Sequence, residues 1–255
     1  VGTLFFVFTF IEQHAWMLPE VFERPVVDLR IQWKACGTLV GSFNLFVYGS
    51  LIYGGEKLTG DSSYGCSRLA YGLLGVGLLN SFTNFAHHTY HLPQSELVKW
   101  IAFVVSMVEI VILARVILDM VKALEAKKTE GFEAPHFFFK AAKVWTLVML
   151  VISILISVPS LNSVIHGTPV VLAHAMGTEI GIDSMVLFGA IAWILTELRG
   201  SQAVSTTLTR VAAKGFNHGT ALLVGWLLAS GLVIGVTRYE GKGLPTWLAD
   251  AGPYA

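Results

Sequence analysis

The sequence predicts an all-α protein, a polytopic transmembrane helix bundle of about seven spans that forms a single integral membrane domain over residues 1–255. Composition is the first observation behind this prediction. Hydrophobic residues make up 54% of the chain and charged residues 13%, and the mean hydropathy is +0.66. A soluble domain carries about a quarter charged residues. The formal net charge is zero, so the composition does not support a nucleic-acid partner.

The second observation is a series of seven stretches that are long and apolar enough to cross a bilayer, which takes about 20 residues. They lie near 1–18, 36–54, 68–91, 97–121, 138–158, 170–197 and 208–237. Helix-breaking or charged residues end the first three. Pro19 and Pro25 follow the first, Gly54-Gly55-Glu56-Lys57 follows the second, and Pro93 follows the third.

The later stretches are separated in the same way. The lysine-rich segment 122–143 follows the fourth, Pro159 follows the fifth, and Arg199-Gly200-Ser201 follows the sixth. The seventh, 208–237, is the last apolar stretch of the chain. An odd number of spans places the two termini on opposite faces of the membrane.

The basic residues of the connections predict which face is cytoplasmic. The connections after the second, fourth and sixth stretches carry Lys57, Arg68, Lys122, Lys127, Lys128, Lys140, Lys143, Arg199, Arg210 and Lys214. The other face carries Arg24, Arg30, Lys34, Lys99, Arg238 and Lys242. We therefore expect the first face to be cytoplasmic in a bacterial or archaeal inner membrane.

Two groups of histidines lie inside the apolar stretches, where burying an imidazole is costly unless it binds something. His87 and His88 are near the end of the third stretch, and His174 lies about one turn into the sixth. These stretches run in opposite directions, so the three side chains and Cys36 should meet in one layer near the outer face. A histidine pair and a third histidine on another helix favour a metal or a haem inside the bundle.

Each histidine also has a structural interpretation. His87 and His88 point about 100° apart on an ideal helix, so they share one metal only if the helix end is distorted, which Pro93 favours. His91 lies on the same face as His87 and offers a rival pair for zinc or copper. The alternative is an interfacial cluster that reaches water. His174, flanked by alanines that let a flat macrocycle approach, could instead be a hydrogen-bonded core histidine.

Ionisable residues within the spans are further candidates. Glu109 lies in the middle of the fourth stretch and is a proton relay or metal neighbour by default, with a satisfied structural acid as the alternative. Arg115 is spaced to pair with Asp119 at i+4. Glu179 and Asp183 have the same spacing and are interpreted as facing a polar channel rather than lipid.

The two cysteines imply neither a disulfide framework nor a covalently attached haem. Cys36 and Cys66 fall at opposite ends of neighbouring spans, so they should be too far apart to pair. The chain has no Cys-x-x-Cys-His sequence, which attached haem requires.

Several motifs combine around these residues. An adjacent histidine pair ends a helix in Asn84-Phe-Ala-His87-His88-Thr-Tyr, and a run from His166-Gly167-Thr168 to Ala173-His174 follows about 80–90 residues downstream. Glu109 lies between them, and Lys57-Leu-Thr-Gly60 precedes them. In these features the chain resembles the haem–copper oxidase superfamily and, within it, the large catalytic subunit of nitric oxide reductase. The likeness runs from about residue 28 to 238 and implies helices V to XI of a twelve-helix subunit.

The resemblance implies a role for individual residues. His87 and His88 would bind a non-haem metal, iron or copper, and Glu109 matches an acid that the reductases place beside their non-haem iron. His174 would be the axial ligand of a high-spin haem b, and His166 would lie near the haem propionates. The Lys57–Gly60 turn resembles the loop between the two metal-bearing helices.

The chain also departs from the family pattern. Cys36 falls where the third non-haem ligand should be a histidine, and Val40 and Asn44 replace two glutamates. Met176 stands where a second histidine would bind a low-spin haem. Two alternatives follow: the methionine binds that haem and raises its potential, or that haem is absent. A thiol ligand at Cys36 would favour copper or zinc over iron.

Three functions remain open on this evidence. The first is reduction of nitric oxide to nitrous oxide with electrons from a cytochrome c-type subunit or a quinol. The second is oxygen reduction, and the third is a degenerate, non-catalytic membrane subunit of a respiratory complex. In each case we expect other membrane subunits to supply the missing helices, and no nucleic-acid partner.

Overall fold

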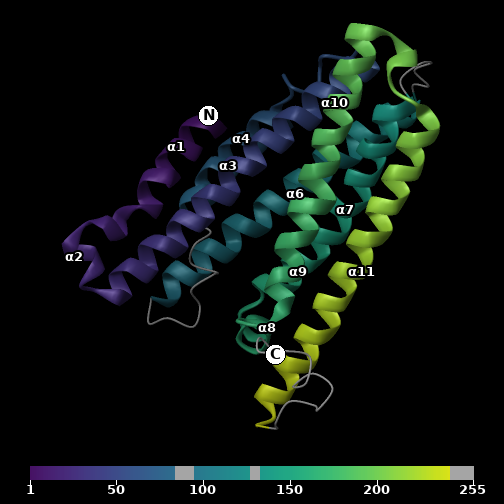
Figure 1. Cartoon of the computed structure of the whole chain (residues 1–255). Helices are drawn as coiled ribbons and strands as arrows, with labels where there is room; N and C mark the ends of the chain where they lie inside the picture. The colour runs from purple at the N-terminus through teal and green to yellow at the C-terminus, as the bar shows by residue number, and fades with distance from the viewer. Residues whose placement is uncertain (84–94, 127–132, 242–255) are drawn as a thin grey trace. The chain divides into compact units, whose positions relative to one another are not determined.

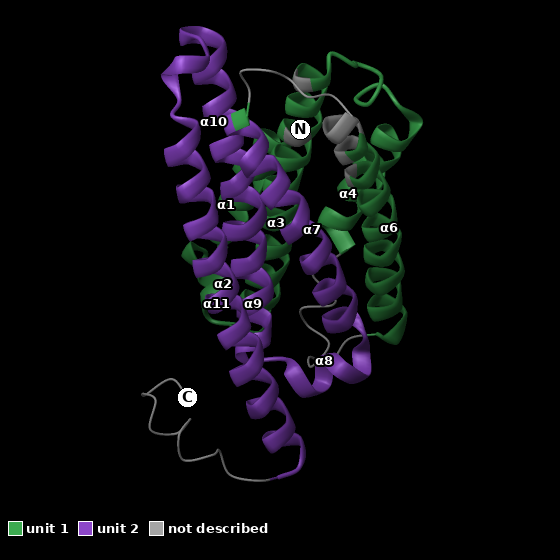
Figure 2. Ribbon diagram, turned by 90° about the vertical axis from the view of Figure 1, so that its right-hand side faces the viewer, with its two compact units in different colours: residues 1–133 green, residues 134–255 purple. Residues whose placement is uncertain are grey.

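The computed structural model describes residues 1–83, 95–126 and 133–241, and every regular element in that part of the chain is a helix. The predicted all-α class is therefore confirmed. The chain divides into two compact units, residues 1–133 and 134–255. Figure 1 colours the chain by residue number, and Figure 2 gives each unit its own colour. Five described helices are long and apolar enough to cross a membrane: Pro25–Lys57, Glu96–Val116, Glu133–Ser157, Pro169–Arg199 and Thr206–Tyr239.

The first unit is built on one long helix. Its elements are α1 (Gly2–Gln13), η1 (Ala15–Met17), α2 (Pro19–Phe22), α3 (Pro25–Thr59), α4 (Arg68–Thr83) and α6 (Glu96–Ala126). The central helix α3 packs against α1, α4 and α6, and α4 also packs against α6. It begins with Pro25 in its first turn, and Gly60, in the left-handed conformation at φ 69°, ends it.

Two details of this unit differ from the expected spans. The stretch 1–18 is α-helical only over α1, which has 12 residues and is followed by the turn η1. The Gly54–Lys57 run, expected as a connection, forms the last turns of α3 instead. Thr59 explains part of this, because its hydroxyl donates to the Gly55 carbonyl at 2.8 Å and ties the last turn together. The expected continuation of the third span beyond Thr83 lies outside the described residues.

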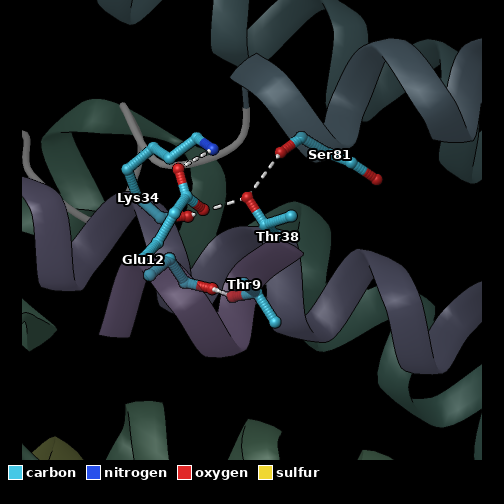
Figure 3. A network of polar contacts seen from close by, with 6 residues as sticks. Thr9, Glu12, Lys34, Thr38 and Ser81 are labelled. Carbon is cyan, nitrogen blue, oxygen red and sulfur yellow. Dashed lines mark hydrogen bonds and ion pairs between the residues drawn. The ribbon is translucent and has the colours of Figure 1, made fainter. Parts of the chain in front are cut away.

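Small and hydroxyl-bearing residues bring α1, α3 and α4 close together (Figure 3). Thr9 of α1 donates to the Ala35 carbonyl of α3 at 2.5 Å. Ser42 of α3 donates to the Gly2 carbonyl at 2.7 Å. A side chain at Gly41 would collide with Ser81 of α4. Hydroxyls that bond to a neighbouring backbone, with glycine opposite, are typical of membrane helix contacts.

The second unit contains α7 (Glu133–Ser157), α8 (Pro159–Ile165), α9 (Pro169–Thr178), the π-helix η2 (Glu179–Asp183), α10 (Ser184–Arg199), η3 (Ser201–Ala203) and α11 (Thr206–Tyr239). Prolines stand at the start of α8 and α9, where they need no backbone donor. Thr168 caps α9 by accepting from the Val170 N–H at 3.3 Å. The elements α9, η2 and α10 follow one another without a break.

Glycines set the spacing of the helices in this unit. Large side chains of α7 cover three of them: Met149 lies over Gly177, Trp145 over Gly181 and Phe139 over Gly189. On α11, Gly231 lies against the Val170 backbone and Gly235 against the Val164 carbonyl. Added Cβ atoms would collide at four of these glycines and would make a tight contact of 3.0 Å at Gly189. The packing therefore fixes α9 and the α8–α9 turn, which carry His174 and His166.

Candidate functional site

The predicted histidine pair cannot be placed. His87 and His88, together with His91 and Pro93, lie outside the described residues, so their assignment as metal ligands stays a prediction. Within the described residues no group of three or more His, Cys, Asp or Glu side chains is arranged to hold a metal ion.

Cys36 and the two positions that depart from the reductase pattern are all on α3. Cys36 is half-buried and follows Ala35, which is fully buried. Both cysteines are among the described residues and neither forms a disulfide, as expected. Val40 is exposed, whereas Asn44 lines a cavity that also includes Glu109.

Glu109 is buried on α6, with 7% of its surface exposed. The side-chain amide of Asn80, on α4, donates to its carboxylate. The Asn80 carbonyl accepts in turn from the Ser106 hydroxyl at 3.0 Å, which orients the amide. The predicted ion pair between Arg115 and Asp119 is present, with Nε and Oδ2 2.8 Å apart. Within the described residues, no cationic side chain contacts the Glu109 carboxylate.

Sequence reasoning missed Asn80. A signal was present, because Asn80 is an amide within the apolar run Gly77-Leu-Leu-Asn-Ser81 of a predicted span. A buried amide needs hydrogen-bond partners, so a carboxylate on a neighbouring helix was the partner to look for. What the sequence could not give was the pairing of α4 with α6.

A cavity of about 250 Å³ lies between α3, α4 and α6 and includes Glu109 in its wall. Its lining consists of Gly41, Asn44, Leu45, Tyr48, Gly49, Ile52, Tyr53, Glu56, Gly65, Ala70, Tyr71, Leu73, Leu74, Gly77 and Glu109. The second carboxylate, Glu56, accepts from the Gly65 N–H at 2.7 Å. Sequence reasoning also missed Glu56 as a site residue, since the glycines before it suggested a connection.

An ion pair near the other end of α3 was missed as well (Figure 3). Lys34 Nζ lies 2.5 Å from Oε1 of Glu12, and both side chains are more than three-quarters buried, with exposed fractions of 24% and 18%. The lysine also lies over the rings of Phe8 and Phe82, at 4.6 and 5.7 Å from their centres. The other carboxylate oxygen of Glu12, Oε2, is buried and has no hydrogen-bond partner among the described residues. Sequence reasoning placed Lys34 only among the outer-face charges.

His174 is half-buried on α9, and its Nδ1 lies 3.5 Å from the Ser153 hydroxyl of α7. That hydroxyl donates its hydrogen to the Met149 carbonyl at 2.8 Å, so it can only accept from His174. A neutral imidazole with its proton on Nδ1 has a free electron pair on Nε2, the form that binds a metal. Ala173, which precedes His174, is fully buried, and Met176 is half-buried.

His166 caps α8 and is followed by Gly167, which adopts a left-handed conformation at φ 71°. The guanidinium of Arg238, at the end of α11, donates to the Gly167 carbonyl at 3.3 Å. An arginine therefore lies beside the His166 turn, a combination suited to carboxylate groups. Sequence reasoning counted Arg238 only as an outer-face charge.

Glu179 and Asp183 lie in the π-helix η2 rather than in a regular α-helix. Glu179 is exposed and Asp183 is half-buried. Their predicted orientation towards a polar channel stays a prediction.

Comparison with known proteins places these sites in a family. No curated protein matches the chain. The family model described as cytochrome c and quinol oxidase polypeptide I matches residues 1–249. Because the match covers nearly the whole sequence, the chain belongs to this family of haem–copper oxidase-type membrane subunits, whose members bind haem and a further metal.

Proposed function

We propose that this family member is nitric oxide reductase-like and reduces NO to N2O at a haem and a non-haem metal. Two NO molecules, two electrons and two protons then give one N2O and one water. The observation that carries the proposal is Glu109, a buried carboxylate whose hydrogen-bond partner is a neutral amide. A buried carboxylate of this kind can lie next to a metal cation or can hold a proton. The proposed reaction needs both a metal and a proton donor.

The residues around His174 fit a haem. The Ser153 contact leaves Nε2 available, and the close contacts of Gly177 with Met149 and of Val170 with Gly231 fix the position of α9. A bound haem would supply the iron that accepts electrons and binds the gas. His166 and Arg238 would hold the propionates, the imidazole as a hydrogen-bond donor and the guanidinium as a fixed cation.

The chain's own part in the chemistry is the handling of protons. In this proposal Glu109 donates a proton to the oxygen that leaves as water, and Asn80 keeps the carboxylate in position. His87 and His88 bind the non-haem metal, and Cys36 is the third group near it. Met176 is a ligand for a second, low-spin haem.

The family works in multi-subunit membrane complexes that receive electrons from a donor. We propose a cytochrome c-type subunit or a quinol as the donor, and other membrane subunits as partners. We propose that the chain lies in a bacterial or archaeal inner membrane, with its metal-binding layer near the outer face.

A non-catalytic role is the second candidate, and the placement of α3 residues favours it. Cys36 stands where the family pattern has an imidazole, and the exposed Val40 stands where it has a carboxylate. A subunit of this kind would keep the bundle and one haem but would not reduce a gas.

One set of measurements separates these functions. The purified complex is assayed for NO and O2 consumption, and its metals are quantified in the wild type and in a His87→Ala, His88→Ala variant. The proposal expects NO consumption in the wild type and loss of the non-haem metal in the variant. Equal metal content would refute the metal site, consumption of O2 alone would make the chain an oxygen reductase, and no gas consumption would support the non-catalytic role.

A further inference from the structure

Three cationic side chains lie near the start of two neighbouring helices of the second unit: Lys140 on α7, and Arg210 and Lys214 on α11. All three are exposed. Within the described residues none of them forms an ion pair or a side-chain hydrogen bond. Their charges are therefore available to an anion from outside the chain.

Two contacts between α7 and α11 show that the three cations share one level. The Arg210 guanidinium lies over the Phe137 ring, 5.1 Å from its centre, and Trp145 Nε1 donates to Asn217 Oδ1 at 2.6 Å. These contacts join residues 73 and 72 positions apart, so the two helices run parallel in one register. Lys140 is therefore level with a point between the two cations of α11, within about 5 Å of each along the axis.

The three side chains also border the same exposed surface. Lys140 follows Phe137 by three residues and Lys214 follows Arg210 by four, and residues at these spacings share a helix face. Phe137 and Arg210 are the residues that meet between the helices. The opposite face of α7 is buried, because its large side chains cover the glycines of α9, η2 and α10.

The depth of the cations corresponds to the phosphate groups of a membrane. On α11, residues 219–237 contain no ionisable side chain and extend about 28 Å, close to the thickness of the hydrocarbon core. Lys214 lies five residues before this stretch, about 8 Å along the helix. On α7, the uncharged stretch 144–157 begins four residues after Lys140. The anion most accessible at this depth is a lipid phosphate.

Beyond the cations the same surface is apolar. Val144 and Val148 continue the exposed face of α7. On α11, Ala221 and Gly225 are exposed and small, and a Cβ added at Gly225 would meet nothing within 4 Å. An acyl chain therefore has room to pack against both helices next to the charges.

We propose that α7 and α11 bind an anionic phospholipid, whose phosphate lies between Lys140, Arg210 and Lys214 and whose acyl chain packs along the apolar surface beyond them. Charge decides the class of lipid, because three cations attract a headgroup of net negative charge and gain less from a zwitterionic one. Glu133 also lies on this face of α7, about 10 Å before Lys140, so the headgroup is expected on the Lys140 side. The site does not depend on which gas the protein reduces.

The first test compares two lipids with the same acyl chains. The purified complex in detergent is titrated with dioctanoyl phosphatidylglycerol, dioctanoyl phosphatidylcholine or inorganic phosphate, and its thermal unfolding midpoint is measured. We expect phosphatidylglycerol alone to raise the midpoint saturably, and to do so less at higher ionic strength. Equal effects of the two lipids, or an equal effect of phosphate alone, would overturn the anionic lipid site.

The second test assigns binding to the three cations. Lys140→Gln, Arg210→Gln and Lys214→Gln should each weaken phosphatidylglycerol binding about fivefold, whereas Lys214→Arg keeps the charge and should keep the affinity. Lys122→Gln is the matched control, because Lys122 is an exposed lysine near the end of α6 in the first unit. The haem spectrum should match the wild type in every variant. Wild-type affinity in all three glutamine variants would overturn the site, and so would an equal loss in Lys122→Gln, which would indicate attraction by net charge alone.

The third test measures native lipid. Anionic phospholipid that remains with the purified complex is extracted and quantified by mass spectrometry. Lys214→Gln should retain less than the wild type, and so should Gly225→Leu, which fills the apolar surface and keeps all three cations. Gly75→Leu, at an equally open glycine of α4, is the control. Unchanged lipid content in Lys214→Gln and Gly225→Leu, with a polypeptide lost instead, would assign this surface to a protein partner and overturn the proposal.

Discussion

The two units use different chemistry on helices of similar hydropathy. In the first unit, membrane helices carry ionisable groups with polar partners: Glu12 with Lys34, Glu109 with Asn80, and Glu56 with the Gly65 N–H. In the second unit, glycines covered by Met149, Trp145 and Phe139 hold the helix that carries His174. In the proposed function, proton handling and the non-haem metal belong to the first unit, and haem binding belongs to the second. The predictions below test each side of it.

The largest effect is expected at His174. Replacing it with alanine removes the proposed axial ligand, so the high-spin haem signal should be lost completely from the absorption spectrum of the purified complex. His218→Ala is the control, because His218 is an exposed histidine on α11. An unchanged haem spectrum in His174→Ala would show that the second unit does not bind this haem through His174.

The next effect concerns Glu109. Glu109→Gln keeps the shape and removes the titrating group, so NO consumption should fall by about 10²-fold or more, while the haem content stays at the wild-type level. Asn80→Ala should lower the rate less, because it loosens the carboxylate without removing it. Wild-type turnover in Glu109→Gln would make the acid structural.

The free energy of unfolding should depend more on Lys34, whose partner Glu12 is mostly buried, than on Lys99, whose partner Glu96 is exposed. Lys34→Met leaves the Glu12 carboxylate without its cation in a mostly buried position, which should lower the free energy of unfolding by about 3 kcal/mol. Lys99→Met leaves behind Glu96, whose side chain is 73% exposed and stays hydrated, so it should change the free energy of unfolding by less than about 1 kcal/mol. Thermal unfolding in detergent measures both. Equal effects would show that Glu12 and Lys34 contribute no more than surface charges.

The smallest effect is expected from glycine packing. Gly181→Ala places a Cβ 2.5 Å from the Trp145 ring and should destabilise the second unit by about 1–3 kcal/mol. Gly225→Ala, on α11 with open space above it, should instead stabilise slightly because alanine favours a helix. Thermal unfolding again provides the measurement, and an unaffected Gly181→Ala would mean that Trp145 can move aside.

The apolar helices were largely predictable because apolar length is a local signal, but their ends were not. Pro25, expected in the connection before a span near 36–54, lies in the first turn of α3, and the helix ends at Gly60 rather than at Gly54. The prediction failed at Gly54–Lys57, where two glycines suggested a break. There the hydrogen bond of Thr59 and the contact of Glu56 with Gly65 accompany a helix that continues.

The partners of the buried charges were not predictable. Glu12 and Lys34 are 22 residues apart, and Asn80 and Glu109 are 29 apart. Such contacts depend on which helices pack together and in what register, and a single sequence does not contain that information. The Arg115–Asp119 pair was predictable because one helical turn fixes its geometry.

The π-helix η2 determines how α9 and α10, which it joins without a break, are rotated relative to each other about their common axis. A π-turn closes its hydrogen bonds over one residue more than an α-turn, and one residue corresponds to about 100° of rotation. The extra residue in Glu179–Asp183 therefore sets the angle between the face that carries His174 and the face that carries Gly189. Deleting one residue there would give a straighter α-helix but would turn one half against the other. His174 and the Phe139 contact at Gly189 could then no longer both face their present neighbours on α7.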